Sequence, residues 1–495
     1  MDILYSSTRG DNKKVKASEA ILQGLASDGG LFVPDHLPKL DKSLKELSQM
    51  EYRDVAFEVL KLLLTDYSDE ELRYCIDNAY DSKFDSKEIA PMTEAGGAFY
   101  LELYHGKTIA FKDMALSILP YLMTTAAKKS GVTNEIVILT ATSGDTGKAA
   151  LAGFADVPGT RIVVFYPKDG VSPIQKQQMV TQTGDNTCVI GINGNFDDAQ
   201  TGVKKMFTDK NLASELDSKG FQFSSANSIN IGRLMPQVAY YVFAYTRLLK
   251  EGRIADGDKI NVVVPTGNFG NILAAFYAKS MGLPIAKLIC ASNSNKVLYD
   301  FFKSGEYDRN REFILTSSPS MDILISSNLE RLIYHIAGDS ASKNAELMKE
   351  LSTTGKYTIT DDMKSKLSDF YGDYATEAET SEAIKKLYDS TGYLIDTHTA
   401  VASAAYTKYV DETGDKTPSV IASTASPFKF TRSVLSSIAD IDESADDFTL
   451  ADKLSEISGV AIPDAVSSIR NAKIRHKEIC EIGDMEKEVK SFLGI

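Results

Sequence analysis

The chain has 495 residues, which allows about two to four domains, and its 43% apolar and 25% charged content is ordinary for a globular protein. The formal net charge of −14 argues against a nucleic-acid or anionic-membrane surface, although a small anionic substrate needs only a local positive pocket. Four widely separated cysteines, no leader-like N-terminus and no membrane-length apolar run predict a cytoplasmic protein without disulfides.

Residues 1–92 are predicted to form a mainly helical domain, in which Tyr52–Leu64 has apolar residues at helical spacing. From about residue 93 the pattern changes to short β-branched runs, each followed by a turn and a helical pattern. These runs are Glu135–Thr140, Thr160–Tyr166, Thr187–Ile192, Lys259–Pro265, Ala286–Ala291 and Ser419–Ser423. Their alternation with helices predicts an α/β fold with buried parallel sheets.

Two regions interrupt or follow this alternation. Residues from about 330 to 390 are polar and rich in charge, which predicts a helical insertion at the periphery of the fold. Residues 446–495 predict an acidic, solvated helical extension.

Lys112 is the strongest candidate for a catalytic residue. It lies in the segment His105–Asp113, and the neighbouring residues Ile109–Phe111 and Met114–Leu116 are mainly apolar. A lysine in an apolar pocket can lose its proton and become a nucleophilic amine. Most lysines are solvated surface groups, so Lys112 alone is weak evidence for catalysis and the prediction depends on its neighbouring motifs.

Two glycine-rich loops follow predicted strands and precede helical patterns. Pro265–Asn271 would present N–H groups and the positive end of a helix to a phosphate, and Thr142–Gly147 could bind a carboxylate. Alone, the first is compatible with an ordinary βα turn, and the second with a plain helix N-cap at Asp145 or Thr146. Together with Lys112, the loops indicate a phosphate-bearing aldehyde cofactor bound to the lysine as a Schiff base.

Other motifs carry weaker signals. In Ser423–Phe430 a threonine hydroxyl could bond a ring nitrogen, although a turn before Pro427 accounts for the same residues. The five histidines include no pair at metal-ligand spacing, so no metal site is predicted. His105 and His398 have suggestive neighbours, but a structural role is favoured for both. No GxSxG elbow supports a hydrolase triad.

These motifs, in this order, resemble those of the threonine synthases, pyridoxal-phosphate enzymes of the tryptophan synthase β-like fold (fold type II). The resemblance covers most of the chain. It is carried by Tyr5–Gly10, Ser27–Pro34, His105–Asp113, Thr142–Gly147, Asn227–Asn230 with Arg233, Pro265–Asn271, Ser320–Ile323, Ser326–Arg331, Asp396–Ala400 and Ser423–Ala425.

The resemblance implies two parallel-sheet subdomains in a catalytic domain, residues 93–445, between an N-terminal threonine synthase domain, 1–92, and the extension 446–495. The smaller subdomain, about 130–225, would be mobile. Lys112 would carry pyridoxal 5′-phosphate and later shuttle protons, and Thr424 would face the pyridine nitrogen. The residues expected to hold the cofactor phosphate are Gly267, Asn268, Phe269, Gly270 and Asn271. Those expected to bind substrate are Ser143, Gly144, Asp145, Thr146, Gly147, Asn227 and Arg233.

The chain departs from the family pattern at two places. Ser426 precedes Pro427 where many relatives have a histidine, which puts in doubt any role for that position but not for Thr424. Ile231–Gly232 replaces the aromatic–small pair that is common before the arginine.

The implied reaction converts O-phospho-L-homoserine and water into L-threonine and phosphate by γ-elimination and β-addition, the last step of threonine biosynthesis. A phospholyase or a threonine/serine dehydratase of the same fold would use the same lysine and loops, and a non-catalytic ligand-binding homologue is a more remote alternative. The expected partner is the small substrate, without nucleic acid or membrane, and the protein would be a monomer or a homodimer.

Overall fold

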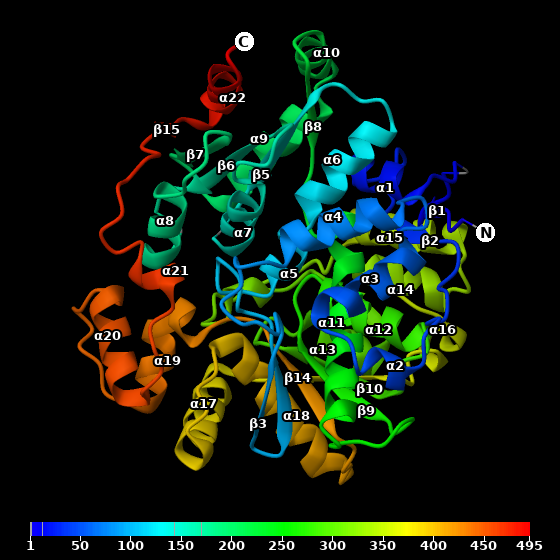
Figure 1. Cartoon of the computed structure of the whole chain (residues 1–495), viewed down its shortest axis with the longest axis vertical. Helices are drawn as coiled ribbons and strands as arrows, with labels where there is room; N and C mark the ends of the chain where they lie inside the picture. The colour runs from blue at the N-terminus through cyan, green and yellow to red at the C-terminus, as the bar shows by residue number, and fades with distance from the viewer. Residues whose placement is uncertain (1, 12, 143, 170) are drawn as a thin grey trace.

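Two mainly parallel sheets form the centre of the molecule, one above the other in Figure 1. The computed structural model describes residues 2–11, 13–142, 144–169 and 171–495. The larger sheet contains β3 (Met92–Ala95), β4 (Ala98–Glu102), β9 (Ile260–Pro265), β10 (Ile285–Ser292), β13 (Phe370–Tyr374) and β14 (Ser419–Ser423), in the order β13–β10–β9–β14–β4–β3. Its one antiparallel pair among the described strands is β3 with β4.

The smaller sheet has the order β15–β7–β6–β5–β8, and its described pairings are all parallel. Its strands are β5 (Glu135–Ala141), β6 (Thr160–Pro167), β7 (Thr187–Ile192), β8 (Phe221–Ser224) and β15 (Ile479–Cys480). The six β-branched runs predicted from the sequence are all strands, which confirms the α/β expectation. They are buried on both faces because helices cover both sides of a parallel sheet.

Helices enclose both sheets. The helices that alternate with the strands of the two sheets are α5 (Lys112–Leu116), α6 (Leu119–Lys129), α7 (Asp145–Phe154), α8 (Pro173–Val180), α9 (Phe196–Thr208), α10 (Lys210–Ser218), α11 (Ile231–Lys250), α12 (Gly270–Ser280), α13 (Val297–Ser304), α18 (Thr397–Thr413) and α19 (Thr431–Ile438). Two short 3₁₀ turns, η1 (Pro319–Met321) and η2 (Pro427–Phe430), lie near the ends of strands. Among the described helices, none is long and apolar enough to cross a bilayer.

The N-terminal region is mainly helical, as predicted. It contains α1 (Ala17–Gln23), α2 (Leu44–Leu47), α3 (Tyr52–Leu63) and α4 (Asp69–Ala79), with β1 (Tyr5–Ser7) antiparallel to β2 (Phe32–Pro34). Helix α3 packs on the long helix α11, which also packs on α12. Helix α11 therefore lies between the N-terminal helices and the larger sheet, and it is buried from Ile231 to Leu248.

The substituted pair before Arg233 has a packing explanation. The side chain of Asn230 accepts from the backbone N–H of Gly232 at 2.8 Å and so caps α11. A Cβ atom at Gly232 would lie 2.8 Å from Leu119 Cδ1 and 3.1 Å from Ile21 Cγ2. The close approach of the Leu119 and Ile21 side chains therefore favours glycine at this position.

The region from 330 to 390 contains strands as well as the predicted helices. Its elements are α14 (Leu329–Ile336), α15 (Ala341–Thr354), β12 (Lys356–Thr358), α16 (Asp361–Ser365), β13 and α17 (Glu377–Thr391). Strand β13 pairs in parallel with β10 and forms the edge of the larger sheet, while β12 pairs with β11 (Glu306–Asp308). The expectation of a purely helical, peripheral insertion thus missed a member of the central sheet, because Phe370–Tyr374 is short and includes a glycine and an aspartate.

The C-terminal residues run along one side of both sheets (Figure 1). They form α20 (Asp447–Ser458), α21 (Asp464–Ser467), β15, η3 (Ile482–Asp484) and α22 (Met485–Leu493). Strand β15 extends the smaller sheet beyond β7, and Val489 and Leu493 of α22 join the apolar cluster on that sheet. This region is therefore partly built into the smaller subdomain rather than wholly solvated.

Candidate active site

Lys112 is the first residue of α5 and its side chain is only 11% exposed. Its Nζ donates to Ser320 Oγ at 3.1 Å and lies 3.4 Å from Asp145 Oδ2. Burial lowers the pKa of Lys112, and the charges of Lys429 and Arg233 lower it further, while Asp145 opposes the shift. This environment shifts Lys112 toward the neutral, nucleophilic amine, and its role as the lysine that carries the cofactor stays a prediction.

Asp145 is the central carboxylate of the site. It begins α7 in the smaller subdomain, but three of its partners come from outside that subdomain: Lys112, Ser320 (2.7 Å to Oδ2) and Lys429 (3.1 Å to Oδ1). Gln175 of α8 donates to Oδ1 at 2.8 Å. Burial alone would raise the pKa of Asp145, but the ammonium groups of Lys429 and Lys112 hold it well below its usual range.

Lys429 is a buried cation that the sequence analysis did not assign to the site. It lies in η2, its side chain is 0% exposed, and Nζ donates to the backbone carbonyl of Thr108 at 2.8 Å. The segment before Lys112 and the segment that carries Lys429 are also joined by a bridge between Ala110 and Ala425. Lys429 thus fixes Asp145 against the segment that leads into Lys112.

Ser320 and His398 complete the network around Lys112. The backbone N–H of Ser320 donates to His398 Nε2 at 3.2 Å, and His398 Nδ1 lies 2.8 Å from Asp396 Oδ2. Nε2 therefore accepts a hydrogen bond from η1, and Nδ1 is the ring nitrogen that faces Asp396. His398 therefore has a structural role in holding η1, which carries Ser320, as the sequence analysis favoured for this histidine.

The loop before α12 has the properties of a phosphate site. The backbone N–H groups of residues 267–271 have no acceptor among the described residues, and they lie at the positive end of an eleven-residue helix. Phe269 takes a left-handed conformation with φ of 65°. Its ring packs against Phe302 and Phe370 in the core, so only its backbone faces the loop.

Asn268 and Asn271 of this loop face different ways. Asn268 is exposed, and its backbone carbonyl accepts from Asn328 N–H at 3.0 Å. Asn271 is buried, and its Oδ1 accepts from the hydroxyl groups of Tyr240 and Tyr241 on α11. Its Nδ2 is a buried donor without a partner among the described residues. A phosphate oxygen is a suitable acceptor for such a group.

Arg233 and Asn227 differ in their suitability as anion ligands. Arg233 is 4% exposed, donates to the carbonyl of Ala226 at 3.0 Å, and has a buried Nε without a partner among the described residues. Burial lowers its pKa to about 10. A buried guanidinium with unused donors is suited to an anion. Asn227 is exposed, and its Oδ1 accepts from Ser228.

The loop Thr142–Gly147 differs from the expectation. Thr142 Oγ1 accepts from the N–H groups of Gly144 and Gly147, both at 2.9 Å, so two of the predicted carboxylate donors already have a partner. Thr146 is half-buried on the first turn of α7. Ser143, the remaining predicted residue of this loop, lies outside the described residues.

Thr424 lies beside the segment that carries Lys112. Its backbone carbonyl accepts from Phe111 N–H at 2.8 Å, and its own N–H donates to Thr399 Oγ1 at 3.3 Å. Ser426, at the position where the family pattern has histidine, is buried and caps η2 by accepting from Phe428 N–H at 3.3 Å. The serine therefore stabilises the turn that positions Lys429.

These groups fit a phosphate-bearing aldehyde. A buried amine with a lowered pKa suits the aldehyde carbon, and the unused N–H groups of residues 267–271 with Asn271 Nδ2 suit the phosphate. Lys112 Nζ lies 3.4 Å from Asp145 Oδ2, and the charge of Arg233 contributes to the lowered pKa of Lys112. Sequence reasoning missed Ser320, Lys429 and Gln175 as members of the site; the segment Ser320–Ile323 was quoted only as part of the resemblance.

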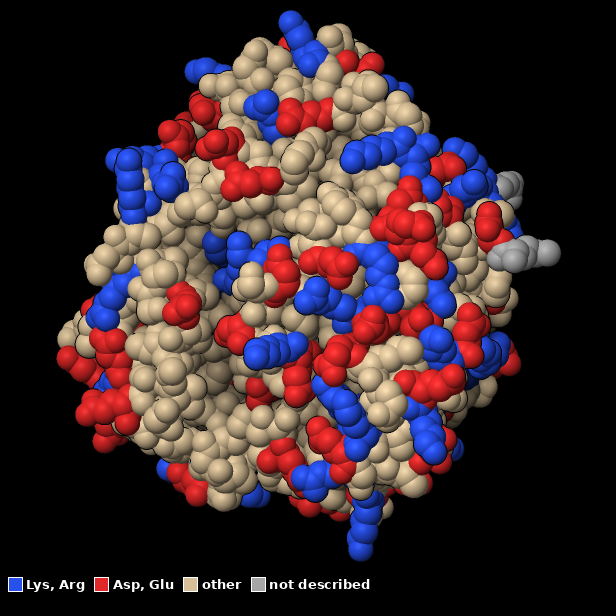
Figure 2. Space-filling model, viewed as in Figure 1, with Lys and Arg blue, Asp and Glu red and all other residues tan. Residues whose placement is uncertain are grey.

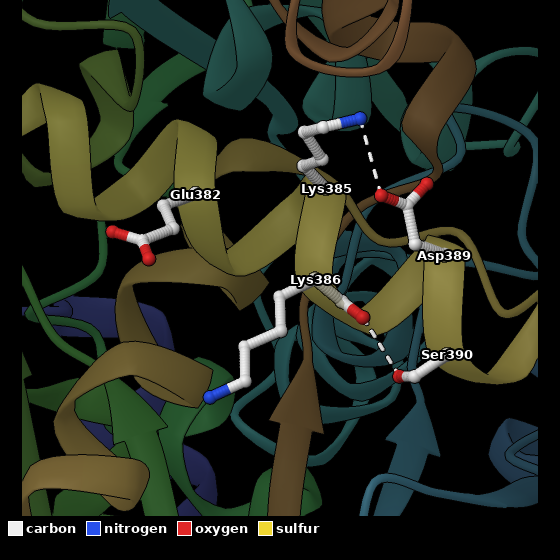
Figure 3. Close-up of a pocket in the computed structure, with 5 residues that line it drawn as sticks. All are labelled: Glu382, Lys385, Lys386, Asp389 and Ser390. Carbon is white, nitrogen blue, oxygen red and sulfur yellow. Dashed lines mark hydrogen bonds and ion pairs between the residues drawn. The ribbon is translucent and has the colours of Figure 1, made fainter.

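A shallow depression on the surface of α17 lacks the features of a ligand site (Figure 3). Its lining consists of exposed side chains from a single helix, Glu382, Lys385, Lys386, Asp389 and Ser390. Lys385 Nζ lies 3.1 Å from Asp389 Oδ2, and Ser390 Oγ donates to the Lys386 carbonyl at 2.7 Å. Such partners within one helix are typical of a solvated face.

His105, at the start of the segment that leads into Lys112, forms a charged cluster with Asp85 and Glu102. Its Nδ1 lies 2.5 Å from Asp85 Oδ1, and its Nε2 lies 2.9 Å from Glu102 Oε2. Burial would lower the pKa of His105, but the interactions with Asp85 and Glu102 raise it to about 9. The histidine is therefore a positively charged structural residue at neutral pH.

The raised pKa of His105 predicts a pH-dependent contribution to stability. The stabilisation is fully present below the unfolded pKa of about 6.5 and is lost as the pH rises through 9, an effect of about 3 kcal/mol. We expect the difference in unfolding free energy between the wild type and His105→Gln, measured in urea, to shrink by this amount between pH 6.5 and 9.5. His36→Gln, which alters an exposed histidine, is the control. A difference that does not change with pH would contradict the assignment.

Comparison with known proteins agrees with this geometry. Residues 4–80 match the family described as threonine synthase N terminus, and residues 87–424 match the family described as pyridoxal-phosphate dependent enzyme. Fold and site thus define a pyridoxal-phosphate-dependent enzyme of the tryptophan synthase β-like fold. The crystal structure of yeast threonine synthase covers 99% of both chains with a TM-score of 0.89 and 33% identity. That of pyridoxal-phosphate-bound threonine synthase from Brucella melitensis covers 100% of both, with a TM-score of 0.88 and 33% identity.

Sequence relatives give the same family. The threonine synthase of Saccharomyces cerevisiae is 37% identical over 462 residues, which cover 87% of this chain and 88% of the relative. Human threonine synthase-like 1 is 42% identical over 445 residues, or 86% of this chain, but the match spans only 59% of that longer protein. The chain belongs to the threonine synthase family.

Proposed function

We propose that the protein is a threonine synthase, which converts O-phospho-L-homoserine and water into L-threonine and phosphate by γ-elimination and β-addition. The observation that carries the proposal is the buried Lys112 amine with its lowered pKa, near the unsatisfied donors of Arg233 and the free N–H groups of residues 267–271. An amine in a site with two sets of unused donors suits a reaction in which cofactor and substrate each carry a phosphate. The relatives named threonine synthase, similar over most of their length, support the same choice.

Lys112 would hold pyridoxal 5′-phosphate by its aldehyde carbon as a Schiff base, with residues 267–271 around the cofactor phosphate and Thr424 near the ring nitrogen. When bound, the cofactor supplies an electron sink for negative charge at the substrate carbons. Thr424 offers a neutral hydroxyl rather than a carboxylate, so it would not hold the ring nitrogen protonated.

Lys112 would also move protons once its amine is free. Burial lowers the pKa of Lys112, which increases the share of neutral amine that can accept a proton from the substrate Cα. Asp145, which stays ionised, would stabilise the resulting ammonium, and the Ser320 hydroxyl between them would fix the direction of Nζ. Because Asp145 links the two subdomains, this arrangement requires them to be closed, which also excludes water from the reaction.

Arg233 would bind the substrate phosphate, because its guanidinium is buried and has unused donors. Asn227 is an exposed neighbour at the end of the preceding loop. The N–H groups of Gly144 and Gly147 would receive the substrate carboxylate only after the Thr142 hydroxyl releases them. Thr146 and Ser143 remain proposed ligands of the same carboxylate.

The test is product identification by NMR after incubation of cofactor-loaded protein with O-phospho-L-homoserine in deuterated water. We expect threonine with deuterium at Cα and an equal amount of phosphate. Release of phosphate with 2-oxobutyrate would instead indicate a lyase of the same fold. A Schiff base of the cofactor absorbs at longer wavelengths than aromatic side chains, so visible absorbance provides a check of loading. Loaded protein without turnover would contradict the substrate assignment.

The proposal also includes the domain boundaries, the cellular setting and the oligomeric state. We propose the division of the chain at residues 92 and 445, with a mobile smaller subdomain at about 130–225. The free thiols of Cys75, Cys188, Cys290 and Cys480 support a reducing, cytoplasmic setting. The protein would act as a monomer or a homodimer.

A further inference from the structure

A cavity of about 640 Å³ lies beside the proposed active site but does not include it. Its walls come from four parts of the chain: residues 82–85, residues 105–109, helices α7 and α8 with the turn after α8, and residues 463–472. Lys112, Asp145 and Ser320, all described residues, are not among the lining residues. In Figure 2 the molecule is hollowed between its upper and lower halves, and Lys and Arg side chains lie in the hollow.

The charge of this cavity is opposite to that of the whole chain. Four cationic groups line it, Lys83, His105, Lys107 and Lys148, against the carboxylates of Asp85 and Asp464, in a protein of net charge −14. Lys83 is paired with Asp81 at 2.5 Å and His105 with Asp85. Lys107 and Lys148 have no carboxylate within ion-pair distance among the described residues, so their charge is available to an anion.

Lys148 is an unusual residue to find without a counter-ion. It is 9% exposed and its one polar partner among the described residues is Gln182 Oε1, at 2.5 Å, which leaves two N–H donors of the ammonium free. Burial and the charge of Lys429 lower its pKa to about 7, and the charge of Asp113 only partly opposes them. A bound anion would supply the missing compensation.

Gln178 provides a second, independent unsatisfied group in the same wall. It is 1% exposed, its Nε2 donates to the Ala465 carbonyl at 3.3 Å, and its buried Oε1 has no partner among the described residues. The bond to Ala465 fixes the orientation of the amide. An acceptor beside unpaired ammonium groups suits a ligand that carries both negative charge and a hydroxyl proton, as phosphate does.

We propose that this cavity binds a phosphate group, presented by inorganic phosphate or by a small organic phosphate, with Lys148 and Lys107 as its cationic ligands. The cavity is larger than inorganic phosphate requires, and Ile109, Ala152 and Ile469 give it an apolar wall that an organic body could contact. A ligand here would join residues 463–472 to α7, the helix that begins with Asp145.

The test is calorimetric titration of the cofactor-loaded protein with inorganic phosphate and, separately, with glycerol 3-phosphate. We expect the wild type to bind one more phosphate per chain than Lys148→Met, which keeps the length of the side chain but removes its charge. Lys107→Gln changes an exposed residue and should weaken the same site about tenfold without affecting the fold. Lys87→Gln, an exposed lysine outside the cavity, is the matched control.

The two titrants distinguish the source of the phosphate. Tighter binding of glycerol 3-phosphate at the Lys148-dependent site supports an organic ligand, and equal or tighter binding of inorganic phosphate supports the free ion. Any phosphate bound at the Lys112 site should persist in all three variants. The number of phosphates bound in the cavity is therefore the stoichiometry of the wild type minus that of Lys148→Met. Equal stoichiometry in the wild type and Lys148→Met, with unchanged affinity in Lys107→Gln, would overturn the proposal.

Discussion

Lys112→Ala is expected to lower turnover of O-phospho-L-homoserine by at least about 10³-fold, because it removes both the covalent holder of the cofactor and the proton carrier. The fold should survive. Alanine is compatible with the first turn of α5, and the substitution removes an amine whose charged form is already disfavoured by burial. The measurement is the rate of phosphate release, with the visible absorbance of the cofactor recorded on the same samples.

The matched control is Lys128→Ala, which removes an exposed lysine from α6. It should retain wild-type turnover and absorbance. Circular dichroism that matches the wild type would show that Lys112→Ala is folded. Turnover of that folded variant within tenfold of the wild type would contradict the proposed role of Lys112.

Asp145→Asn is expected to lower the free energy of unfolding by about 3–5 kcal/mol, because it leaves the fully buried ammonium of Lys429 without its counter-charge. The other described partner of Lys429 is the neutral Thr108 carbonyl, which cannot replace the lost charge. The measurement is urea unfolding at pH 7. The exposed pair Arg470–Asp452 offers the control, since Asp452→Asn should cost no more than about 1 kcal/mol.

A second substitution separates loss of the ion pair from general damage. If an uncompensated charge causes the instability, Asp145→Asn combined with Lys429→Met should be more stable than Asp145→Asn alone by about 0.5–3 kcal/mol. Simple addition of the two single losses would show that the residues do not act as a pair. Because Asp145 comes from the smaller subdomain and Lys429 from η2, the same coupling measures the closure of the two subdomains.

The sheets could be predicted because most of their strands can be recognised from the residue types within the strand itself. Runs such as Thr160–Pro167 and Ile260–Pro265 are β-branched, buried and followed by turns, and a parallel sheet buried on both faces requires this composition. Strands β13 and β15 lack this signal. They are short edge strands whose pairing with β10 and β7 depends on the tertiary fold, and neither is adjacent in sequence to its partner.

The sequence could name candidate site residues where a motif and its proposed role lie in one segment. Lys112 and the loop before α12 are examples. Lys429, Gln175 and Ser320 were missed because their importance comes from a contact with Asp145 across long stretches of chain. Sequence also could not reveal that the Thr142 hydroxyl binds the N–H groups of Gly144 and Gly147.

Strand β15 and helix α22 complete a sheet whose other strands come from far earlier in the chain. During synthesis, β5 to β8 are made long before residues 479–495, so β7 remains an unpaired edge during that interval. The apolar residues that Val489 and Leu493 later cover are exposed for the same time. A nascent chain therefore exposes an unpaired sheet edge and apolar residues until residues 479–495 have been made, and aggregation competes with folding at that stage.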